Sequence, residues 1–352
     1  MKNLPMVTVA IATYNSEKLL PRTLKAIRKQ SYPQEKIEIL IIDGGSKDKT
    51  RLIAQEYGAI AIDNPKTEPV NAKLISVQKA NGRYLLTVDH DEVFENEDSI
   101  KIRVEALMNN PNCKVALCSG YKRPKEYPAL NQYISEFGDP FSLFIYNCSK
   151  DWNSFLPFLK KNYKLEYENE NYACISFDNM KRALIMELCC LGTMIDLEYF
   201  KTITNISEDA QQMVHLFYIM LEQGVSHIII TKNDPLVHYS VDSLKAYFPK
   251  LKWRICNNIH FKEKGQRGFS GREGYQQGIK FKKYLFVPYS IFVPVPLIHG
   301  LYMAVKRHNA IYLMHPLFCL YVTFEIIVQM FLKIIGKTLQ FRSYDGKDII
   351  AR

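Results

Sequence analysis

Two aspartates one residue apart end an apolar segment of the chain. Residues 84–92 read Tyr-Leu-Leu-Thr-Val-Asp-His-Asp-Glu, and the run of β-prone residues predicts a buried strand. Asp89 and Asp91 follow that strand, at the position where an open α/β sheet binds its ligand. Such hard oxygen ligands suit Mg²⁺ or Mn²⁺, which also bind substrate phosphates. A strand followed by an ordinary acidic turn would give the same residues, so the neighbouring segments decide between the two interpretations.

Two further polar clusters follow predicted strands. Thr13-Tyr14-Asn15-Ser16-Glu17 comes after a strand at 7–12, and Asp43-Gly44-Gly45-Ser46-Lys47-Asp48 comes after a strand at 37–42. Helices at 17–30, 49–57 and 70–80 and a strand at 59–62 fill the intervals. This alternation predicts an α/β fold with a mostly parallel sheet and helices on both faces. All three polar clusters should therefore lie at one edge of the sheet.

The cluster that begins at Asp43 has the residue types of a nucleotide-binding loop. Asp43 can accept hydrogen bonds from a base or ribose, and Gly44 and Gly45 let the backbone approach a ligand closely. A glycine turn that only caps the next helix is the alternative. The chain lacks both GxGxxG and GxxxxGK[ST], so a nucleotide would not be held by those phosphate loops.

Four segments, in this order, resemble the family 2 inverting glycosyltransferases with the GT-A fold. They are VTVAIATYN (7–15), ILIIDGGSKDKT (39–50), ANGRYLLTVDHDE (80–92) and Glu208-Asp209. The resemblance implies that a nucleotide pocket is lined by Thr13, Tyr14, Asn15 and Glu17. It also implies that Asp43 contacts the base, that Asp89 meets the ribose or the metal, and that Asp91 binds the metal on the donor diphosphate.

The chain departs from the family pattern at two positions. Gly44 stands where the family often has a second acid, and Lys73 stands where it often has an arginine on the nucleotide-sugar side. Both differences affect recognition of the base and the diphosphate more than the chemistry of transfer.

The resemblance also assigns residues beyond position 200. Ser207-Glu208-Asp209 is predicted to begin a helix, where an acidic first turn is favourable in itself. In the family, the acid at this place deprotonates the acceptor hydroxyl, which gives Asp209 the role of base with Glu208 as its substitute. His238 matches a histidine that completes the metal or diphosphate site, although a structural histidine would fit the sequence as well.

A long stretch from Tyr121 to Tyr172 is aromatic and is predicted to be rich in loops. Such loops often act as lids or acceptor surfaces. Aromatic rings stack on sugars, but they also fill small cores, and the sequence does not separate these roles for Tyr127, Tyr133, Tyr146, Trp152 and Tyr163.

The C-terminal third contains two apolar segments. Residues 284–305 have no charged side chain and residues 310–332 have one, Glu325; both are long enough to cross a bilayer. More cations flank the pair than lie between its members, which favours cytoplasmic ends for a spanning hairpin. A re-entrant or surface-lying pair and a buried soluble pair are the alternatives. We expect a soluble catalytic domain to fold without the residues from 284 onward.

The composition agrees with a membrane-associated protein of the cytoplasm. The formal net charge is +10, but no nucleic-acid-binding module is present, and the basic residues before 284 suit anionic lipid headgroups better. Eight cysteines without a disulfide-like spacing indicate reduced side chains, and the N-terminus does not predict a signal peptide.

The predicted organisation is a GT-A domain at 1–240, with a nucleotide-binding half at 1–95 and an acceptor half at 96–240. A basic segment at 241–283, the two membrane helices or re-entrant hairpin at 284–336 and a tail at 337–352 follow. The catalytic domain is expected to face the cytoplasm from the cytoplasmic membrane.

The predicted function is metal-dependent, inverting transfer of a sugar from a nucleotide-diphosphate sugar to a glycan or lipid-linked acceptor, in cell-surface polysaccharide or glycolipid synthesis. Transfer to a polyprenyl phosphate and an inactive GT-A-like membrane scaffold are alternatives. Residues 88–93 also fit the Asp-X-Asp-X-[Thr/Val] pattern of haloacid-dehalogenase-like phosphatases, with Asp89 as nucleophile. That family places its motif on the first strand, whereas here two strand units come earlier.

Overall fold

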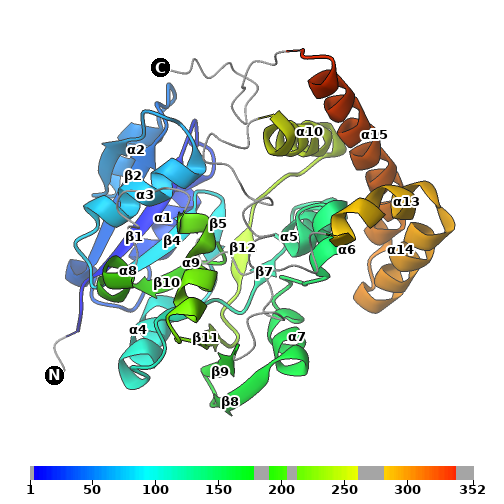
Figure 1. Ribbon diagram of the computed structural model, residues 1–352. Coiled ribbons are helices and arrows are strands. Elements are labelled where there is room, and N and C mark those ends of the chain that lie inside the picture. Colours follow the sequence, from blue (N-terminus) through cyan, green and yellow to red (C-terminus); the bar gives the residue numbers. More distant parts are fainter. Residues whose placement is uncertain (1–3, 178–189, 204–211, 261–280, 338–352) are drawn as a thin grey trace. The chain divides into compact units, whose positions relative to one another are not determined.

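The computed structural model describes residues 4–177, 190–203, 212–260 and 281–337. The chain divides into two compact units (Figure 1). Unit 1 comprises Met1–Lys122 and Asp151–Tyr239, and unit 2 comprises Arg123–Lys150 and Ser240–Arg352.

Four parallel strands form the N-terminal half of the large sheet in unit 1. Their order is β3-β2-β1-β4. The strands are β1 (Val7–Thr13), β2 (Ile37–Asp43), β3 (Ile60–Asp63) and β4 (Tyr84–Asp89). Between them run α1 (Leu20–Arg28), α2 (Thr50–Glu56) and α3 (Pro69–Lys79). The nearly continuous apolar runs of β1, β2 and β4 are buried, as expected for strands covered on both faces. The predicted α/β fold is confirmed.

The other half of the sheet is mixed. Beyond β4 the order continues β10-β6-β11-β9-β8, and β10 runs antiparallel to both of its neighbours. These strands are β6 (Val115–Leu117), β8 (Lys164–Glu168), β9 (Tyr172–Ser176), β10 (Thr193–Asp196) and β11 (His227–Thr231). The helices of this half are α4 (Ser99–Asn109), α7 (Phe155–Asn162), α8 (Leu197–Ile203) and α9 (Gln212–Glu222).

A second, three-stranded sheet completes unit 1. It contains β5 (Glu92–Phe94), β12 (Leu236–His238) and β7 (Tyr121–Lys122), with β12 in the middle. β12 is antiparallel to β5 and parallel to β7. Because β5 begins three residues after β4 ends, the second sheet starts directly beside the carboxyl end of β4.

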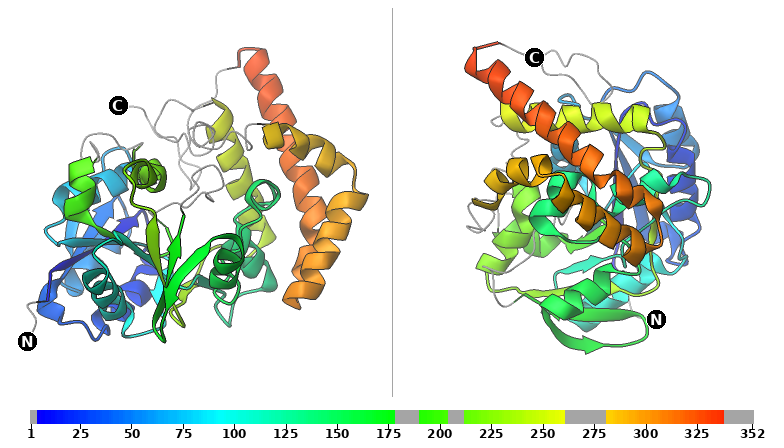
Figure 2. Two further views of the ribbon diagram at one scale, coloured as in Figure 1. Left: turned by 60° about the horizontal axis from the view of Figure 1, so that its bottom comes forward. Right: turned by 90° about the vertical axis from the view of Figure 1, so that its right-hand side faces the viewer.

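Unit 2 is formed by helices in its described residues (Figure 2). They are α5 (Ala129–Phe137), α6 (Pro140–Tyr146), α10 (Leu244–His260), α13 (Phe286–Ile291), α14 (Pro294–Arg307) and α15 (His315–Ile334), with 3₁₀ turns at Lys283–Leu285 and Ala310–Met314. α10 and α6 both pack against α15.

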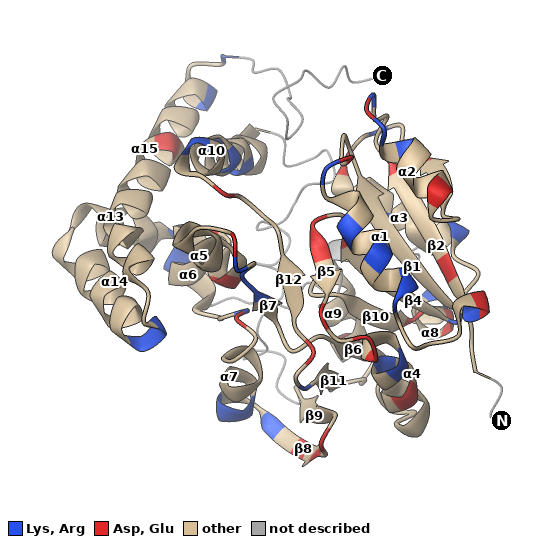
Figure 3. Cartoon of the chain, turned by 180° about the vertical axis from the view of Figure 1, so that it is seen from behind, with Lys and Arg blue, Asp and Glu red and all other residues tan. Residues whose placement is uncertain are grey.

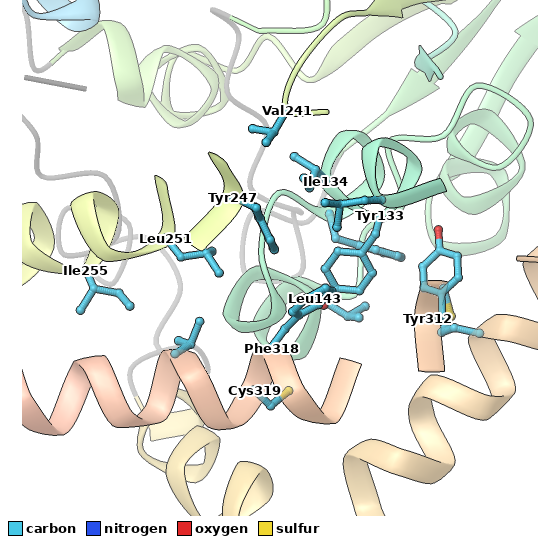
Figure 4. Packing of buried hydrophobic residues seen from close by; sticks show 14 of the residues in the cluster. Tyr133, Ile134, Leu143, Val241, Tyr247, Leu251, Ile255, Tyr312, Phe318 and Cys319 are labelled. Carbon is cyan, nitrogen blue, oxygen red and sulfur yellow. The ribbon is translucent and has the colours of Figure 1, made fainter. Parts of the chain in front are cut away.

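The core of unit 2 joins segments that are far apart in the sequence (Figure 4). Tyr133 of α5 and Phe318 of α15 are fully buried, with ring centroids 5.1 Å apart. Tyr247 of α10 lies 5.3 Å from the same Phe318 ring. Residues from 284 onward are therefore part of this core, and the expectation that folding does not need them is wrong for unit 2.

One other expectation is corrected. The stretch from 121 to 172 is not mainly loops, because it forms α5, α6, α7 and β8. The apolar segment 284–305 is a bent pair of helices, because Lys283–Ile291 and Pro294–Arg307 are bent by 93° at the break between them. The prolines at 288, 294 and 296 provide the physical reason, since proline removes a backbone donor. By length and apolar composition, the described residues offer one unbroken helix that could cross a membrane, Ala310–Ile334.

Candidate active site

The ends of β1 and β2 are tied together through Asp43. Thr13 lies opposite Asp43 in the parallel register, and its hydroxyl donates to Asp43 Oδ1 at 3.1 Å. Ser46 donates to the same carboxylate twice, from its backbone N–H (3.0 Å) and from its hydroxyl (2.5 Å). Asp43 is only 1% exposed. Its carboxylate therefore fixes the shape of the glycine loop that follows it.

The loops after β1 and β2 also bind each other directly. Asn15 has a left-handed backbone (φ 48°), and its N–H donates to Ser46 Oγ at 2.8 Å. Lys47 N–H returns a bond to Asn15 Oδ1 at 2.9 Å. Glu17 N–H donates to Asp48 Oδ2, and Lys49 N–H donates to Glu17 Oε2, both at 3.1 Å. Residues 13–17 and 43–49 thus form one hydrogen-bonded rim at the carboxyl edge of the sheet.

Asp89 and Asp91 follow β4 at the same edge. Asp89 pairs with Ala12 in the parallel register, one residue before Thr13. The turn between the aspartates is held by α1, because the Thr23 hydroxyl donates to the His90 carbonyl at 2.8 Å. The parallel register therefore places the three polar clusters at one edge of the sheet, as the strand pattern predicts.

His238 reaches Asp91 from the second sheet. Its Nε2 lies 3.7 Å from Asp91 Oδ2, and both side chains are partly exposed. The next residue, Tyr239, donates its backbone N–H to the Asp91 carbonyl at 2.7 Å. The short strand β12 therefore fixes the position of the imidazole relative to the Asp89–Asp91 turn.

Glu92 and Tyr121 form a buried layer beneath this pair. Glu92 lies opposite His238 in the β5–β12 register, and Tyr121 stacks on the His238 ring with centroids 4.5 Å apart. The Tyr121 hydroxyl donates to Glu92 Oε1, and Glu92 Oε2 accepts from Asp89 N–H at 3.1 Å. Burial, together with the charges of Asp89 and Asp91, raises the pKa of Glu92 to about 8.

The segment before β10 approaches the same layer. Leu191 donates its backbone N–H to the Tyr121 hydroxyl at 3.2 Å. Cys190 lies 3.9 Å, from sulfur to Nζ, from Lys73 on α3. Lys73 is thereby placed near residues 190–191, which in turn contact Tyr121.

The sequence-derived site residues are found in two groups along one sheet edge. Thr13, Tyr14, Asn15, Glu17 and Asp43 belong to the loop rim, whereas Asp89, Asp91 and His238 belong to the end of β4 and the second sheet. Glu208 and Asp209 lie outside the described residues. The sequence reasoning did not assign Glu92 and Tyr121. Glu92 could have been found in the sequence, because it is the third acid of Asp89-His90-Asp91-Glu92. Tyr121 could not, because it lies in the two-residue strand β7, which leaves no sequence pattern.

The donor set suits a hard divalent cation. Asp91 and Asp89 offer carboxylate oxygens and His238 an imidazole, a combination that fits Mn²⁺ or Mg²⁺. Within the described part of the chain, no three His, Cys, Asp or Glu side chains converge into a ready-made cluster. Phosphate oxygens and water would therefore have to supply the remaining ligands.

Comparison with known proteins supports one family. The glycosyl transferase family 2 model matches residues 8–184, just over half of the chain. Glycosyltransferase AglE of Haloferax volcanii is 31% identical over 94 residues, which cover 25% of this chain and 31% of that protein. Validoxylamine A glucosyltransferase of Streptomyces hygroscopicus subsp. limoneus is 28% identical over 142 residues, which cover 38% of this chain and 31% of the relative. The matched segments thus span about a third of these relatives.

A solved structure agrees in fold. A mannosyltransferase from Pyrobaculum calidifontis, in complex with GDP-Man and Mn²⁺, matches with a TM-score of 0.53 at 13% identity, over 93% of this chain and 88% of that chain. The family model covers the strands β1, β2 and β4, whose carboxyl ends carry the candidate site. The chain belongs to glycosyl transferase family 2 and has the GT-A fold.

Proposed function

We propose that the enzyme transfers a sugar from a nucleotide-diphosphate sugar to a glycan or lipid-linked acceptor, with a divalent cation and with inversion at the anomeric carbon. The observation that carries this proposal is the placement of Asp91 and His238, 3.7 Å apart, beside Asp89 at the carboxyl end of β4. The hydrogen-bonded rim of residues 13–17 and 43–49 lies at the same sheet edge, where α/β enzymes bind nucleotides.

In this proposal, Asp89, Asp91 and His238 hold Mg²⁺ or Mn²⁺. The ion would offset the negative charge of the departing diphosphate. Glu92 and Tyr121 act as positioning residues, because Glu92 accepts the Asp89 N–H and Tyr121 stacks on His238. Lys73 is proposed to add a positive charge on the diphosphate side.

Thr13, Tyr14, Asn15 and Glu17 are proposed to line the nucleotide pocket. Asp43 would meet the base with the acceptor capacity that remains. A carboxylate has about four acceptor positions. Thr13 and Ser46 occupy three of those on Asp43, and Arg51 NH1 lies 3.6 Å from Asp43 Oδ2. The same three bonds keep the loop in place before the nucleotide binds, which lowers the ordering cost of binding.

The acceptor base is proposed to be Asp209, with Glu208 as its substitute. A carboxylate at this place removes the proton of the acceptor hydroxyl while the oxygen attacks from the face opposite the diphosphate, so the configuration inverts. Both residues lie outside the described part of the chain, and this assignment rests on the sequence. A polyprenyl phosphate acceptor already carries a negative oxygen, and Asp209 would then only position it.

The enzyme is proposed to work at the cytoplasmic membrane, with the catalytic unit on the cytoplasmic side. The apolar helix Ala310–Ile334 supports membrane association. The cations beside the C-terminal apolar segments support contact with anionic headgroups.

A panel of UDP- and GDP-sugars tests the proposal. The full-length protein should release nucleoside diphosphate from one of them with Mn²⁺ and stop when EDTA is added. Membranes or a lipid extract should be supplied in parallel as a source of acceptor. Release that is indifferent to EDTA would contradict the metal assignment, and no release from any donor would support the inactive-scaffold alternative.

A further inference from the structure

α15 carries apolar side chains on both of its faces. Its exposed stripe is apolar at helical spacing, and it extends from the preceding 3₁₀ turn through Leu313, Leu317, Leu320, Phe324, Ile327, Phe331 and Ile334. Its buried face combines the core residues Phe318, Cys319 and Val322 with the polar residues His315, Thr323, Glu325 and Gln329. A soluble surface helix has a polar outer face, so the exposed stripe of α15 is suited to contact something other than water.

α14, which packs against α15, has exposed apolar side chains as well. Leu297, Ile298, Leu301 and Val305 are 48–68% exposed, and the 3₁₀ turn and α13 add Tyr284, Leu285 and Ile291. Among residues 281–337 the sequence contains one acid, Glu325, which is buried and whose Oε1 lies 3.5 Å from Nζ of the exposed Lys252 of α10. Figure 3 shows α13 to α15 almost without acidic residues and with basic residues near the ends of α14 and α15.

The turn between α14 and α15 is attached to polar side chains of α5. Arg307 Nε donates to the buried Glu136 of α5 at 2.8 Å, and the Tyr312 hydroxyl donates to the same carboxylate. Asn309 donates its amide to Gln132 at 2.7 Å. The turn therefore lies against α5, where a charged pair would be lost if the turn moved.

The N-terminal end of the α13–α14 pair and the C-terminal end of α15 are attached to α6 and α10. Lys282 donates to the carbonyl of Ile145 at 2.9 Å, and Lys333 donates to the carbonyl of Ile259 at 2.7 Å. Ile145 belongs to α6, which follows α5 after Gly138 and Asp139. α10, which packs along α15, contains Lys245, Lys250, Lys252 and Arg254 and is too charged to cross a bilayer.

We infer that α13 to α15 lie in the plane of an anionic membrane surface and do not cross it. The stripes on α14 and α15 would enter the acyl boundary, and Lys283, Lys306, Lys333 and Lys337 would meet the phosphate groups. A spanning hairpin would place the 306–309 turn across the bilayer from both outer ends, whereas α5, α6 and α10 hold all three. This inference rests on the proposed membrane association and defines its geometry.

Vesicle flotation tests the surface. The full-length protein should float with vesicles of phosphatidylglycerol and phosphatidylcholine, and less with phosphatidylcholine alone. Phe324→Gln with Phe331→Gln should lower the partition coefficient about tenfold or more, because each ring loses its transfer free energy into the acyl region. Leu52→Gln on α2, where Leu52 is 53% exposed, is the matched control and should leave flotation unchanged. Self-association through this face without vesicle binding would overturn the inference.

Labelling with a membrane-impermeant maleimide tests the topology. Lys306→Cys and Lys337→Cys should both react from the cytoplasmic face of inverted membrane vesicles and from that face alone, against the background of the parent protein. Reaction of Lys306→Cys only from the opposite face would establish a spanning hairpin and overturn the inference, while sugar transfer would be unaffected. Absence from membranes and vesicles would overturn the membrane association as well, and donor hydrolysis in solution would then still report the catalytic proposal separately.

Discussion

Glu92 is a buried carboxyl group beside the charges of Asp89 and Asp91. It is 1% exposed and is held by the Tyr121 hydroxyl and by the Asp89 N–H. Burial disfavours its charged form, and the neighbouring carboxylates add to this effect, so its pKa rises to about 8. Glu92 therefore keeps a proton in the metal-free folded protein at pH values where the unfolded chain has lost it.

We predict that Glu92→Gln flattens the pH dependence of stability in EDTA. The ordinary pKa is 4.5 and the folded one is about 8, so the wild-type free energy of unfolding should fall as the pH rises through this window. Urea denaturation at about pH 5.5, 7 and 8.5 measures the slope. Glu95→Gln, at an exposed neighbouring position, should keep the wild-type slope. An unchanged slope in Glu92→Gln would mean that the carboxyl is ionised throughout.

Asp209→Asn should leave donor binding nearly intact and lower turnover about 10²-fold or more, the usual scale for a lost general base. Binding of the nucleoside diphosphate by calorimetry and transfer to the acceptor should be measured on the same preparation. Turnover close to that of the wild type would assign the base elsewhere or favour a phosphate acceptor.

At the scale of elements, the three-stranded sheet brings the site together. β5, β12 and β7 carry Glu92, His238 and Tyr121, which are far apart in the sequence. The turn before β12 is anchored by a buried ion pair, with Arg103 NH2 3.1 Å from Asp234 Oδ2. Burial raises the pKa of Asp234, and the charge of Arg103 opposes this. The placement of His238 thus depends on the ion pair between Arg103 of α4 and Asp234 in the turn between β11 and β12.

Removing one partner of this pair should be costly. Asp234→Ala leaves Arg103 buried without its counter-charge and should destabilise the protein by about 3–5 kcal/mol. The exposed pair Lys122–Glu95, at 2.7 Å, is the control, and Glu95→Ala should cost about 1 kcal/mol or less. Urea unfolding monitored by circular dichroism measures both. Equal effects of the two substitutions would contradict the anchoring role.

Neighbouring positions on α15 separate its two faces. Phe318 is fully buried and Leu317 is 50% exposed. Phe318→Ala should cost about 3–5 kcal/mol of unfolding free energy in detergent-free buffer, whereas Leu317→Ala should change it by about 0.5 kcal/mol or less. A large loss in Leu317→Ala would mean that the exposed stripe is covered by protein in solution.

The first four strands could be predicted because each is a local apolar run, and three of them, β1, β2 and β4, end in a polar cluster. Parallel alternation then required the Thr13, Asp43 and Asp89 clusters to meet. β7 could not be predicted, because two residues carry no periodic signal and its pairing with β12 joins residues more than a hundred positions apart. The packing of α5 on α15 could not be predicted either. Aromatic residues such as Tyr133 fit a loop, a sugar-stacking surface or a core equally well.

At the scale of the whole molecule, the chain passes between the two units three times, after Lys122, Lys150 and Tyr239. Unit 1 contains the proposed donor and metal site, and unit 2 contains the apolar surface. Residues 123–150 complete the core of unit 2 with the C-terminal helices. A protein cut at 284 would therefore leave α5, α6 and α10 with an open core, so surface substitutions are the better means of separating membrane binding from catalysis.

Metal-dependent nucleotide binding tests the central claim most directly. Titration of UDP and of GDP into the full-length protein, with Mn²⁺ and with EDTA, should show metal-dependent binding of one of them in the wild type. Asp91→Asn should remove this dependence, because an amide lacks the charge that the cation needs, and Glu97→Gln at an exposed position should retain it. Binding by Asp91→Asn that still responds to Mn²⁺ as the wild type does would contradict the site at the end of β4.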